Sequence, residues 1–120
     1  MKYKRGDIVL VEMGYNVGNE QGGKRYAVVI EKNPVAQPVV TIVPIATLGG
    51  TKTRERLHES EVFLGEVLPG ADSYAIPLHA RAISKLRIIK PKAPPALAKL
   101  SVEQLDAIDA VIASYFTKNT

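Results

Sequence analysis

Helical spacing of apolar residues occurs in only one part of this 120-residue chain, close to its end. Before about residue 90, β-branched and other apolar residues form short runs that Gly, Pro and charged segments interrupt. The runs span residues 8–13, 25–31, 39–47, 61–64, 73–77 and 86–89. This pattern predicts a mostly β fold, a small antiparallel barrel closed by one C-terminal α-helix.

The size of the chain fits one domain, residues 1–120, because 46% hydrophobic content at this length can bury a core without disulfides or metals. We expect the barrel to occupy about residues 3–90. Its third run, residues 39–47, is almost continuously apolar, as in a strand buried on both faces or at the centre of a barrel. A proline-rich connector at residues 91–99 then leads to a helix at about residues 101–116.

The predicted helix begins at a capping box, in which Ser101 stands three residues before Gln104. Leu100 and Leu105 flank this box and can form a hydrophobic staple. Beyond the cap, apolar residues recur at three- and four-residue steps: Leu105, Ile108, Val111, Ile112, Tyr115 and Phe116. We expect this stripe to pack on the barrel of the same chain.

Composition excludes several kinds of site. The chain has no Cys, which rules out thiol nucleophiles, thiolate metal sites and disulfides, and it has only two His. We therefore expect neither a metal ion nor another cofactor. No stretch approaches the roughly 18 to 20 apolar residues of a membrane span, so we expect a cytoplasmic protein without membrane contact.

Charge is distributed unevenly along the chain. Residues 1–99 hold 15 basic and 9 acidic residues, whereas the last 21 residues hold one Lys and three acids. A basic body suits a phosphate-bearing partner, although a solvated surface of mixed charge would give the same balance. Basic residues recur among Thr, Glu and Gly at residues 48–61, and we predict a second, mobile loop there.

The loop between the first two runs is the richest in functional groups. Gly22 and Gly23 allow the backbone to approach a ligand closely. Acceptor, amide and cationic groups flank them: Glu20, Gln21, Lys24 and Arg25. We predict a ligand site on this long hairpin connection; a solvent-exposed hairpin tip is the alternative.

Three segments together resemble the MazF/PemK family of toxin endoribonucleases, over about residues 3–90. They are KRGDIVLVEMGYNVGNEQGGKRYAVVIE, TIVPIAT and DSYAIPLHARAISKLRI. The family opens with a Gly-Asp pair, carries Gly-x-Glu-Gln-Gly-Gly-x-Arg-Pro in its first loop, and ends a later strand in Ser or Thr. The matching positions are Gly6, Asp7, Gly18, Glu20, Gln21, Gly22, Gly23, Arg25 and Thr47.

Two residues depart from the family pattern. Tyr26 stands in place of the signature Pro, which would have fixed the chain direction next to Arg25. His79 stands where a Gln commonly precedes the x-Arg of the RNA-contacting segment, which here ends in Arg81. We expect these departures to affect the placement of Arg25 and the choice of base, and to leave the fold intact.

The resemblance implies an SH3-like antiparallel barrel in which Arg25 and Thr47 are the catalytic pair. A guanidinium offers fixed, planar donors to the charge that builds on phosphate oxygens when a 2′-hydroxyl attacks phosphorus. Thr47 adds a hydroxyl donor. Because Arg stays protonated, our candidate for the proton acceptor is Glu20, acting directly or by holding Arg25 in place.

Sequence-specific RNA recognition usually targets unpaired bases, which stack on aromatic or Arg planes and form hydrogen bonds at their edges. The candidate RNA-binding residues are Tyr15, Gln21, Gly22, Arg54, His79 and Arg81. An alternative for the chemistry is a pair of histidines, His58 and His79, acting as acid and base.

The resemblance also implies an overall function. We expect a metal-independent endoribonuclease that dimerises, cuts single-stranded mRNA at a short sequence, leaves a 2′,3′-cyclic phosphate and a 5′-hydroxyl, and is neutralised by a cognate antitoxin. Two alternatives belong to other classes. One is a catalytically silent barrel that binds RNA or protein, and the other is a gyrase-inhibiting toxin of related fold. Arg25, Thr47 and Glu20 argue against the silent barrel, and the EQGGKR signature argues against the gyrase inhibitor.

Overall fold

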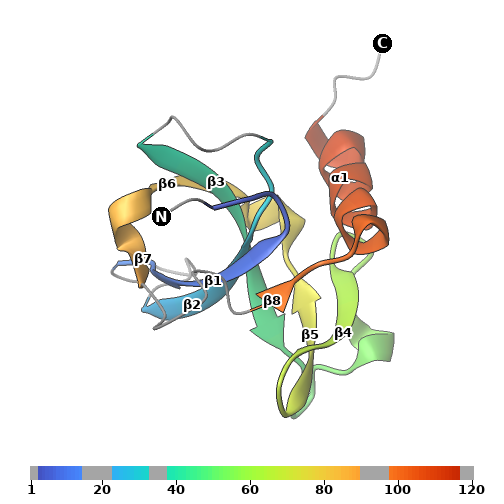
Figure 1. Ribbon diagram of the computed structural model, residues 1–120. Coiled ribbons are helices and arrows are strands. Elements are labelled where there is room, and N and C mark those ends of the chain that lie inside the picture. The colour runs from blue at the N-terminus through green and yellow to red at the C-terminus, as the bar shows by residue number, and fades with distance from the viewer. Residues whose placement is uncertain (1–2, 15–22, 33–37, 90–97, 117–120) are drawn as a thin grey trace.

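The computed structural model describes residues 3–14, 23–32, 38–89 and 98–116 (Figure 1). These residues form strands, three short 3-10 helices and one α-helix. The strands are β1 (Asp7–Glu12), β2 (Lys24–Val29), β3 (Val39–Thr47), β4 (Val62–Leu68), β5 (Ala71–Ala75), β6 (Arg81–Ser84), β7 (Ile88–Ile89) and β8 (Ala98–Lys99). The helices are η1 (Arg54–Arg56), η2 (Pro77–His79), η3 (Lys85–Arg87) and α1 (Val102–Phe116).

All strand pairs are antiparallel, in the order β4-β5-β3-β2-β1-β7. β6 pairs with β3 and β8 pairs with β1, and together the strands curl into a nearly closed barrel with α1 at one side (Figure 1). The predicted first hairpin is confirmed, because β1 pairs with β2 from Ile8↔Val28 to Glu12↔Lys24. The predicted mostly β fold with one C-terminal helix is confirmed as well.

The apolar core lies on both faces of the central strands, because their side chains alternate between two clusters. On β3, Val40 and Ile42 belong to the cluster inside the barrel. Val43 and Ile45 belong to a second cluster, which also holds Ile108 of α1. The prediction that residues 39–47 form a strand buried on both faces is therefore correct.

The predicted helix cap is present. The Ser101 N–H donates to Gln104 Oε1 at 2.8 Å, and the Gln104 N–H donates to Ser101 Oγ at 3.2 Å. Gln104 Nε2 also donates to the Leu64 carbonyl at 2.8 Å, which ties the start of α1 to β4. Leu100 and Leu105 are both buried in the second cluster, as the staple requires.

The apolar stripe of α1 packs on the barrel as far as Ile112, but not at the end of the helix. Ile108 is fully buried and Ile112 is partly buried, but Tyr115 is 42% exposed and Phe116 is 64% exposed. Tyr115 Oη donates to Glu59 Oε1 at 3.0 Å. Burial and this hydrogen bond raise the pKa of Tyr115. The end of the helix thus contacts the segment before β4 through a polar bond, a contact that the stripe did not predict.

The Gly-Asp pair before β1 has a structural role. Gly6 has a φ of +97°, and a Cβ there would lie 3.3 Å from Leu105 Cδ1. The buried Asp7 carboxylate accepts the Lys4 N–H at 2.8 Å through Oδ2 and lies 3.2 Å from Lys99 Nζ through Oδ1. The pair therefore joins the N-terminal turn to β8 and α1.

Several boundaries differ from the prediction. Residues 73–77 were expected to be one strand, but β5 ends at Ala75, and Pro77 begins η2 because it has no N–H for a strand ladder. Residues 86–89 begin in η3, where Ser84 Oγ accepts the Leu86 N–H at 3.2 Å. β6 and β8 were not predicted, because each is too short to show a pattern of its own.

The predicted connector lies mostly outside the described residues, apart from β8 at its end. Across the part of the chain that the structure describes, no helix is long and apolar enough to cross a membrane.

Candidate functional site

Arg25 and Thr47 lie at adjoining ends of neighbouring strands. The β2–β3 ladder ends at Tyr26↔Ile45, so the next residues along the two strands are Arg25 and Ala46, and Thr47 follows as the last residue of β3. Both candidate side chains are exposed. The fold therefore brings the two residues to one edge of the sheet, and their catalytic roles stay predictions.

The glycine-rich loop begins and ends beside this edge. The Met13 N–H donates to the Gly23 carbonyl at 2.7 Å, and the Gly23 N–H donates to the Gly14 carbonyl at 2.9 Å. These bonds close the neck of the loop at Gly23, just before Arg25 in the chain. Four candidate residues lie outside the described residues and keep their roles as predictions: Tyr15, Glu20, Gln21 and Gly22.

Arg87 is a basic residue at this neck that the sequence interpretation did not single out. Gly14 has a φ of +88°, and a Cβ added there would lie 3.1 Å from Arg87 Nη1. The guanidinium of Arg87 therefore lies against the backbone where the loop begins. The sequence carries no signal for this contact, because it depends on the pairing of β7 with β1.

His79 and Arg81 occupy a different part of the sheet. His79 ends η2, and Arg81 pairs with Ile42 on β3. Ile42 precedes Thr47 by five residues, or about 16 Å of strand. Both side chains are exposed, but the structure does not bring Arg81 to the strand end that holds Thr47.

The predicted second loop, residues 48–61, folds back onto the sheet and is not an open loop. Gly49 and Lys52 exchange two backbone hydrogen bonds of 3.0 Å around Gly50, which has a φ of +59°. The chain then forms η1 and a turn in which the Glu61 N–H donates to the His58 carbonyl at 2.9 Å. We call residues 48–61 the basic segment.

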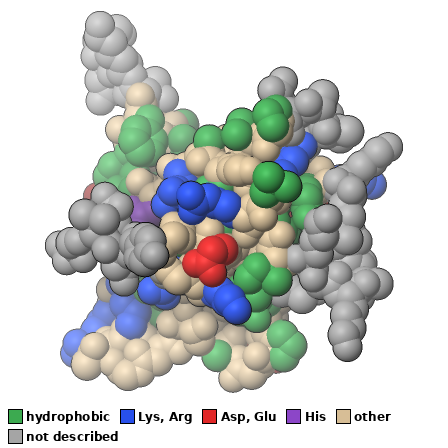
Figure 2. All heavy atoms as spheres, turned by 90° about the vertical axis from the view of Figure 1, so that its left-hand side faces the viewer, with side chains coloured by type: hydrophobic (Ala, Val, Ile, Leu, Met, Phe, Trp, Pro, Cys, Tyr) green, Lys and Arg blue, Asp and Glu red, His purple; other side chains and the backbone are tan. Residues whose placement is uncertain are grey.

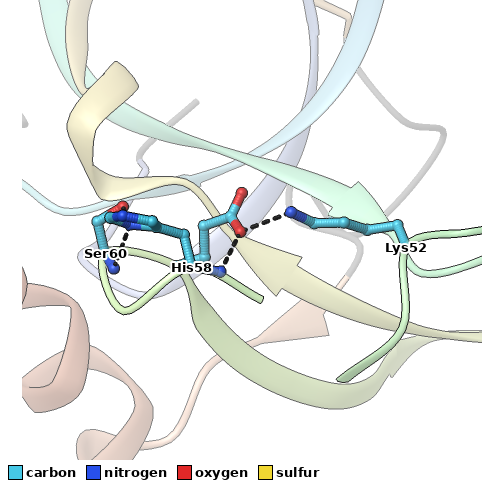
Figure 3. Close-up of polar contacts among 4 residues, drawn as sticks. Lys52, His58 and Ser60 are labelled. Carbon is cyan, nitrogen blue, oxygen red and sulfur yellow. Dashed lines mark hydrogen bonds and ion pairs between the residues drawn. The ribbon is translucent and has the colours of Figure 1, made fainter. Parts of the chain in front are cut away.

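Glu61 joins the two ends of the basic segment (Figure 3). Its Oε1 accepts Lys52 Nζ at 2.7 Å and the His58 N–H at 2.8 Å. Burial by itself would raise the pKa of Glu61, but these hydrogen bonds and the nearby positive charge outweigh it and lower the pKa below its ordinary value. The same hydrogen bond raises the pKa of Lys52. The pair is therefore ionised at neutral pH.

The two histidines have different surroundings. His58 Nδ1 accepts the N–H of the buried Ser60 at 3.1 Å and lies 2.8 Å from Ser60 Oγ, as Figure 3 shows. This ring stabilises a turn before β4, whereas His79 lies between β5 and β6. The contacts of His58 thus add nothing in favour of an acid–base pair with His79.

Two cations of the basic segment lie over aromatic rings. Lys52 Nζ is 5.2 Å from the centre of the Tyr74 ring, and Arg54 Cζ is 4.0 Å from the centre of the Phe63 ring. Phe63 pairs with Tyr74, and Tyr74 pairs with Ala46, the residue before Thr47. The basic segment is therefore anchored on β4 and β5, and β5 pairs with the end of β3 that presents Thr47. Phe63 and Tyr74 were not singled out in the sequence, because their partners come from another segment.

Basic side chains also gather on the barrel face shown in Figure 2, with an acidic side chain among them. This face agrees with the basic body expected from the sequence. Within the described ranges, no group of three or more His, Asp or Glu side chains is placed to hold a metal ion.

The chain is thus a small, mostly β protein, a nearly closed antiparallel barrel with one C-terminal helix and with Arg25 and Thr47 at adjoining strand ends. The family model described as "PemK-like, MazF-like toxin of type II toxin-antitoxin system" matches residues 4–116. The chain belongs to this family of toxin endoribonucleases, and the family prediction is confirmed.

Solved structures share the fold. MazF (Form-I) from Deinococcus radiodurans superposes with a TM-score of 0.74 at 20% identity, covering 97% of each chain. An endoribonuclease in complex with its cognate antitoxin from Mycobacterial species gives 0.70 at 16% identity, covering 99% of each chain. MazE-MazF (Form-II) from Deinococcus radiodurans gives 0.71 at 19% identity, covering 98% of this chain and 97% of the other. Comparison with curated proteins finds no match.

Proposed function

We propose that this chain is a toxin that cuts single-stranded mRNA at a short sequence, without a metal ion, and that a cognate antitoxin neutralises it in the cytoplasm. Family membership supports the endoribonuclease activity. The observation that carries the proposal is the position of Arg25 and Thr47 at adjoining ends of β2 and β3, beside the closed neck of the glycine-rich loop. These two side chains are exposed and so are accessible to a large substrate.

In the proposed reaction, the 2′-oxygen of one nucleotide forms a bond to its own 3′-phosphorus while the bond from phosphorus to the 5′-oxygen of the next nucleotide breaks. The products are a 2′,3′-cyclic phosphate and a 5′-hydroxyl. Arg25 stabilises the charge on the non-bridging oxygens, and Thr47 donates a further hydrogen bond. Glu20 takes the proton of the 2′-hydroxyl, or holds Arg25 while water takes that proton, and the departing 5′-oxygen receives a proton from water.

The substrate is proposed to cross the strand ends and the basic face. Tyr15, Gln21 and Gly22 contact it from the glycine-rich loop, and Arg54 contacts it from the basic segment. His79 and Arg81 bind a more distant part of the strand, since Arg81 pairs with Ile42. Unpaired RNA suits such a surface, because its bases and phosphates are both accessible.

We also propose a homodimer and an antitoxin that covers the RNA groove with an acidic segment. One similar structure is an endoribonuclease in complex with its cognate antitoxin, and another is a MazE-MazF complex. The basic face supports an acidic partner, because an antitoxin and RNA would then compete for the same positive charge.

The test is cleavage of a long RNA by the purified protein, followed by mapping of 5′-hydroxyl ends, with and without EDTA. We expect ends at one short sequence and equal cleavage in EDTA, because the proposed chemistry uses only side chains. Loss of cleavage in EDTA, restored by a divalent ion, would contradict the mechanism. Binding without any cleavage would favour the silent barrel, and inhibition of gyrase without cleavage would favour the gyrase-inhibiting toxin.

A further inference from the structure

The contact between Arg54 and Phe63 does more than bring a positive charge to the basic segment. The guanidinium carbon lies 4.0 Å above the centre of the ring, at van der Waals distance. Arg54 is exposed, while Phe63 is partly buried in β4. A planar cation that rests on a ring in this way has a defined orientation before any ligand arrives.

This stack has a fixed position relative to the candidate catalytic residues. Phe63 pairs with Tyr74, which pairs with Ala46 next to Thr47. Adjacent strands are about 4.8 Å apart, so Phe63 lies roughly 10 Å from β3 across the sheet. An RNA strand that reaches Thr47 therefore passes within reach of Arg54.

Glu61 holds the basic segment in the conformation that forms the stack. Its carboxylate binds Lys52 before η1 and the His58 N–H after it, so Arg54 lies within a loop that is closed by one side chain (Figure 3). Lys52 is held a second time by its position over the Tyr74 ring. Preorganisation of this kind lowers the entropy that a loop loses when it binds.

A stacked guanidinium suits an unpaired base better than a phosphate alone. Proteins that bind single-stranded RNA place bases on aromatic or Arg planes, and every base offers a flat face for this contact. A phosphate binds the N–H groups at the edge of a guanidinium and does not use its flat face. The rigid support of Arg54 by a ring therefore favours a base as its ligand.

We infer that Arg54, backed by Phe63, is a stacking platform for one unpaired base of the RNA, and that Glu61 is the positioning residue of this platform. The inference rests on the proposed function, because it assumes an RNA substrate at the strand ends. It adds a specific mode of contact for Arg54 and roles for Phe63 and Glu61.

The test uses RNA that carries the mapped cleavage sequence with a 2′-deoxy nucleotide at the cleavage position, so that it binds without being cut. One base at a time is removed to give a series of abasic RNAs, and the Kd of each is measured for the wild type, Arg54→Lys and the control Arg56→Lys. Arg56 has the same charge and belongs to the same 3-10 turn.

We expect one abasic position to weaken wild-type binding by roughly 5- to 100-fold, the typical effect of one stacked base. Arg54→Lys should weaken binding of intact RNA by a similar factor and should make that abasic position harmless, because ammonium has no plane. Arg56→Lys should keep the wild-type pattern. If Arg54→Lys weakened binding by the same factor for the intact RNA and for every abasic RNA, the stacking role would be overturned.

Glu61→Ala tests the positioning role, with Glu66→Ala on the exposed side of β4 as its control. In single-turnover cleavage, we expect Glu61→Ala to raise the RNA concentration needed for half-maximal rate several-fold while the rate at saturation is kept. Thermal unfolding verifies that both variants are folded. A several-fold fall in the cleavage rate of Glu61→Ala at saturating RNA would contradict a role limited to binding.

Failure of this inference is distinguishable from failure of the proposed function. If the wild type cuts RNA but no abasic position depends on Arg54, the inference is wrong and the function stands. If the wild type cuts no RNA, the proposed function is wrong, and the inference, which assumes it, is overturned with it.

Discussion

The two segments next to the candidate site are held in different ways. The neck of the glycine-rich loop is closed by backbone hydrogen bonds of Met13, Gly14 and Gly23. The basic segment is held mainly by side chains, with Glu61 binding Lys52 and with Arg54 resting on Phe63. The first kind of closure depends on backbone conformation, whereas the second depends on charge and on aromatic rings.

This difference has consequences for both segments. Backbone closure is insensitive to pH and salt, but it fails when a residue with a positive φ gains a side chain. Closure by an ion pair weakens when the carboxylate is protonated. The neck can therefore be perturbed by a side chain at Gly14, and the basic segment by removing the charge of Glu61. Comparing the two perturbations separates the contributions of the two segments to binding and to chemistry.

The largest effect is expected from Arg25→Ala. Loss of one preorganised donor to a developing charge typically lowers the rate about 100- to 1,000-fold. Arg25→Lys should restore only part of it, because ammonium lacks the planar fork. Single-turnover cleavage at saturating RNA measures both, with circular dichroism as the control for folding. Near-normal cleavage by Arg25→Ala, together with loss of cleavage in His79→Ala, would establish the histidine alternative.

Arg81→Ala is expected to weaken RNA binding about 10-fold, because a charged hydrogen bond to phosphate contributes about 1.5 kcal/mol. The slope of log Kd against log salt should become shallower by about 0.7 to 0.9. The rate at saturating RNA should stay close to the wild type, since Arg81 pairs with Ile42, far along β3 from Thr47. A fall in the saturated rate as large as that of Arg25→Ala would show that the two sites act as one.

Gly14→Ala tests the backbone closure. A side chain at a φ of +88° costs about 1 kcal/mol of stability, and its Cβ would lie 3.1 Å from Arg87 Nη1. We expect a loss of this size in chemical denaturation, with a drop in cleavage as the neck opens. Gly49→Ala is the matched control, because a Cβ there meets nothing within 4 Å and needs no positive φ. Equal stability of the two variants would show that the backbone closure at Gly14 does not stabilise the protein.

The smallest effect is expected from Glu61→Gln on thermal stability. The pKa of Glu61 lies below its ordinary value of 4.5, so its ionised form stabilises the fold above that pH. This contribution is lost as the pH falls through the lower, folded-state pKa. The difference in Tm between wild type and Glu61→Gln should therefore be present at pH 7 and disappear in acid. A difference that stays constant from pH 7 to pH 3 would mean that the charge of Glu61 is irrelevant.

Much of the fold could be predicted from the sequence because its signals are local. The capping box at Ser101 and Gln104 formed as expected, and the almost continuously apolar run at residues 39–47 predicted a strand buried on both faces. The boundaries around η2 and η3 could not be predicted, since Pro77 and the Ser84 cap compete with strand pairing there. β8 depends on pairing with Asp7 and Ile8, about 90 residues earlier in the chain.

For the candidate site, too, local signals were predictable and tertiary contacts were not. Arg25 and Thr47 could be named from a motif, because residue type and spacing already carry that information. Their adjacency depends on the β2–β3 register, which a hairpin pattern alone does not specify.

By itself, the sequence determined the family, the β-rich core pattern, the helix and its cap, and the residue types of the candidate site. These properties follow from local spacing and from side-chain chemistry, which do not depend on distant partners. Only the tertiary structure decided that Arg54 rests on Phe63, that Glu61 closes the basic segment, and that Arg87 lies against Gly14. Each of these contacts joins residues from separate elements, and the strand pairings that bring them together are the outcome of packing the whole barrel.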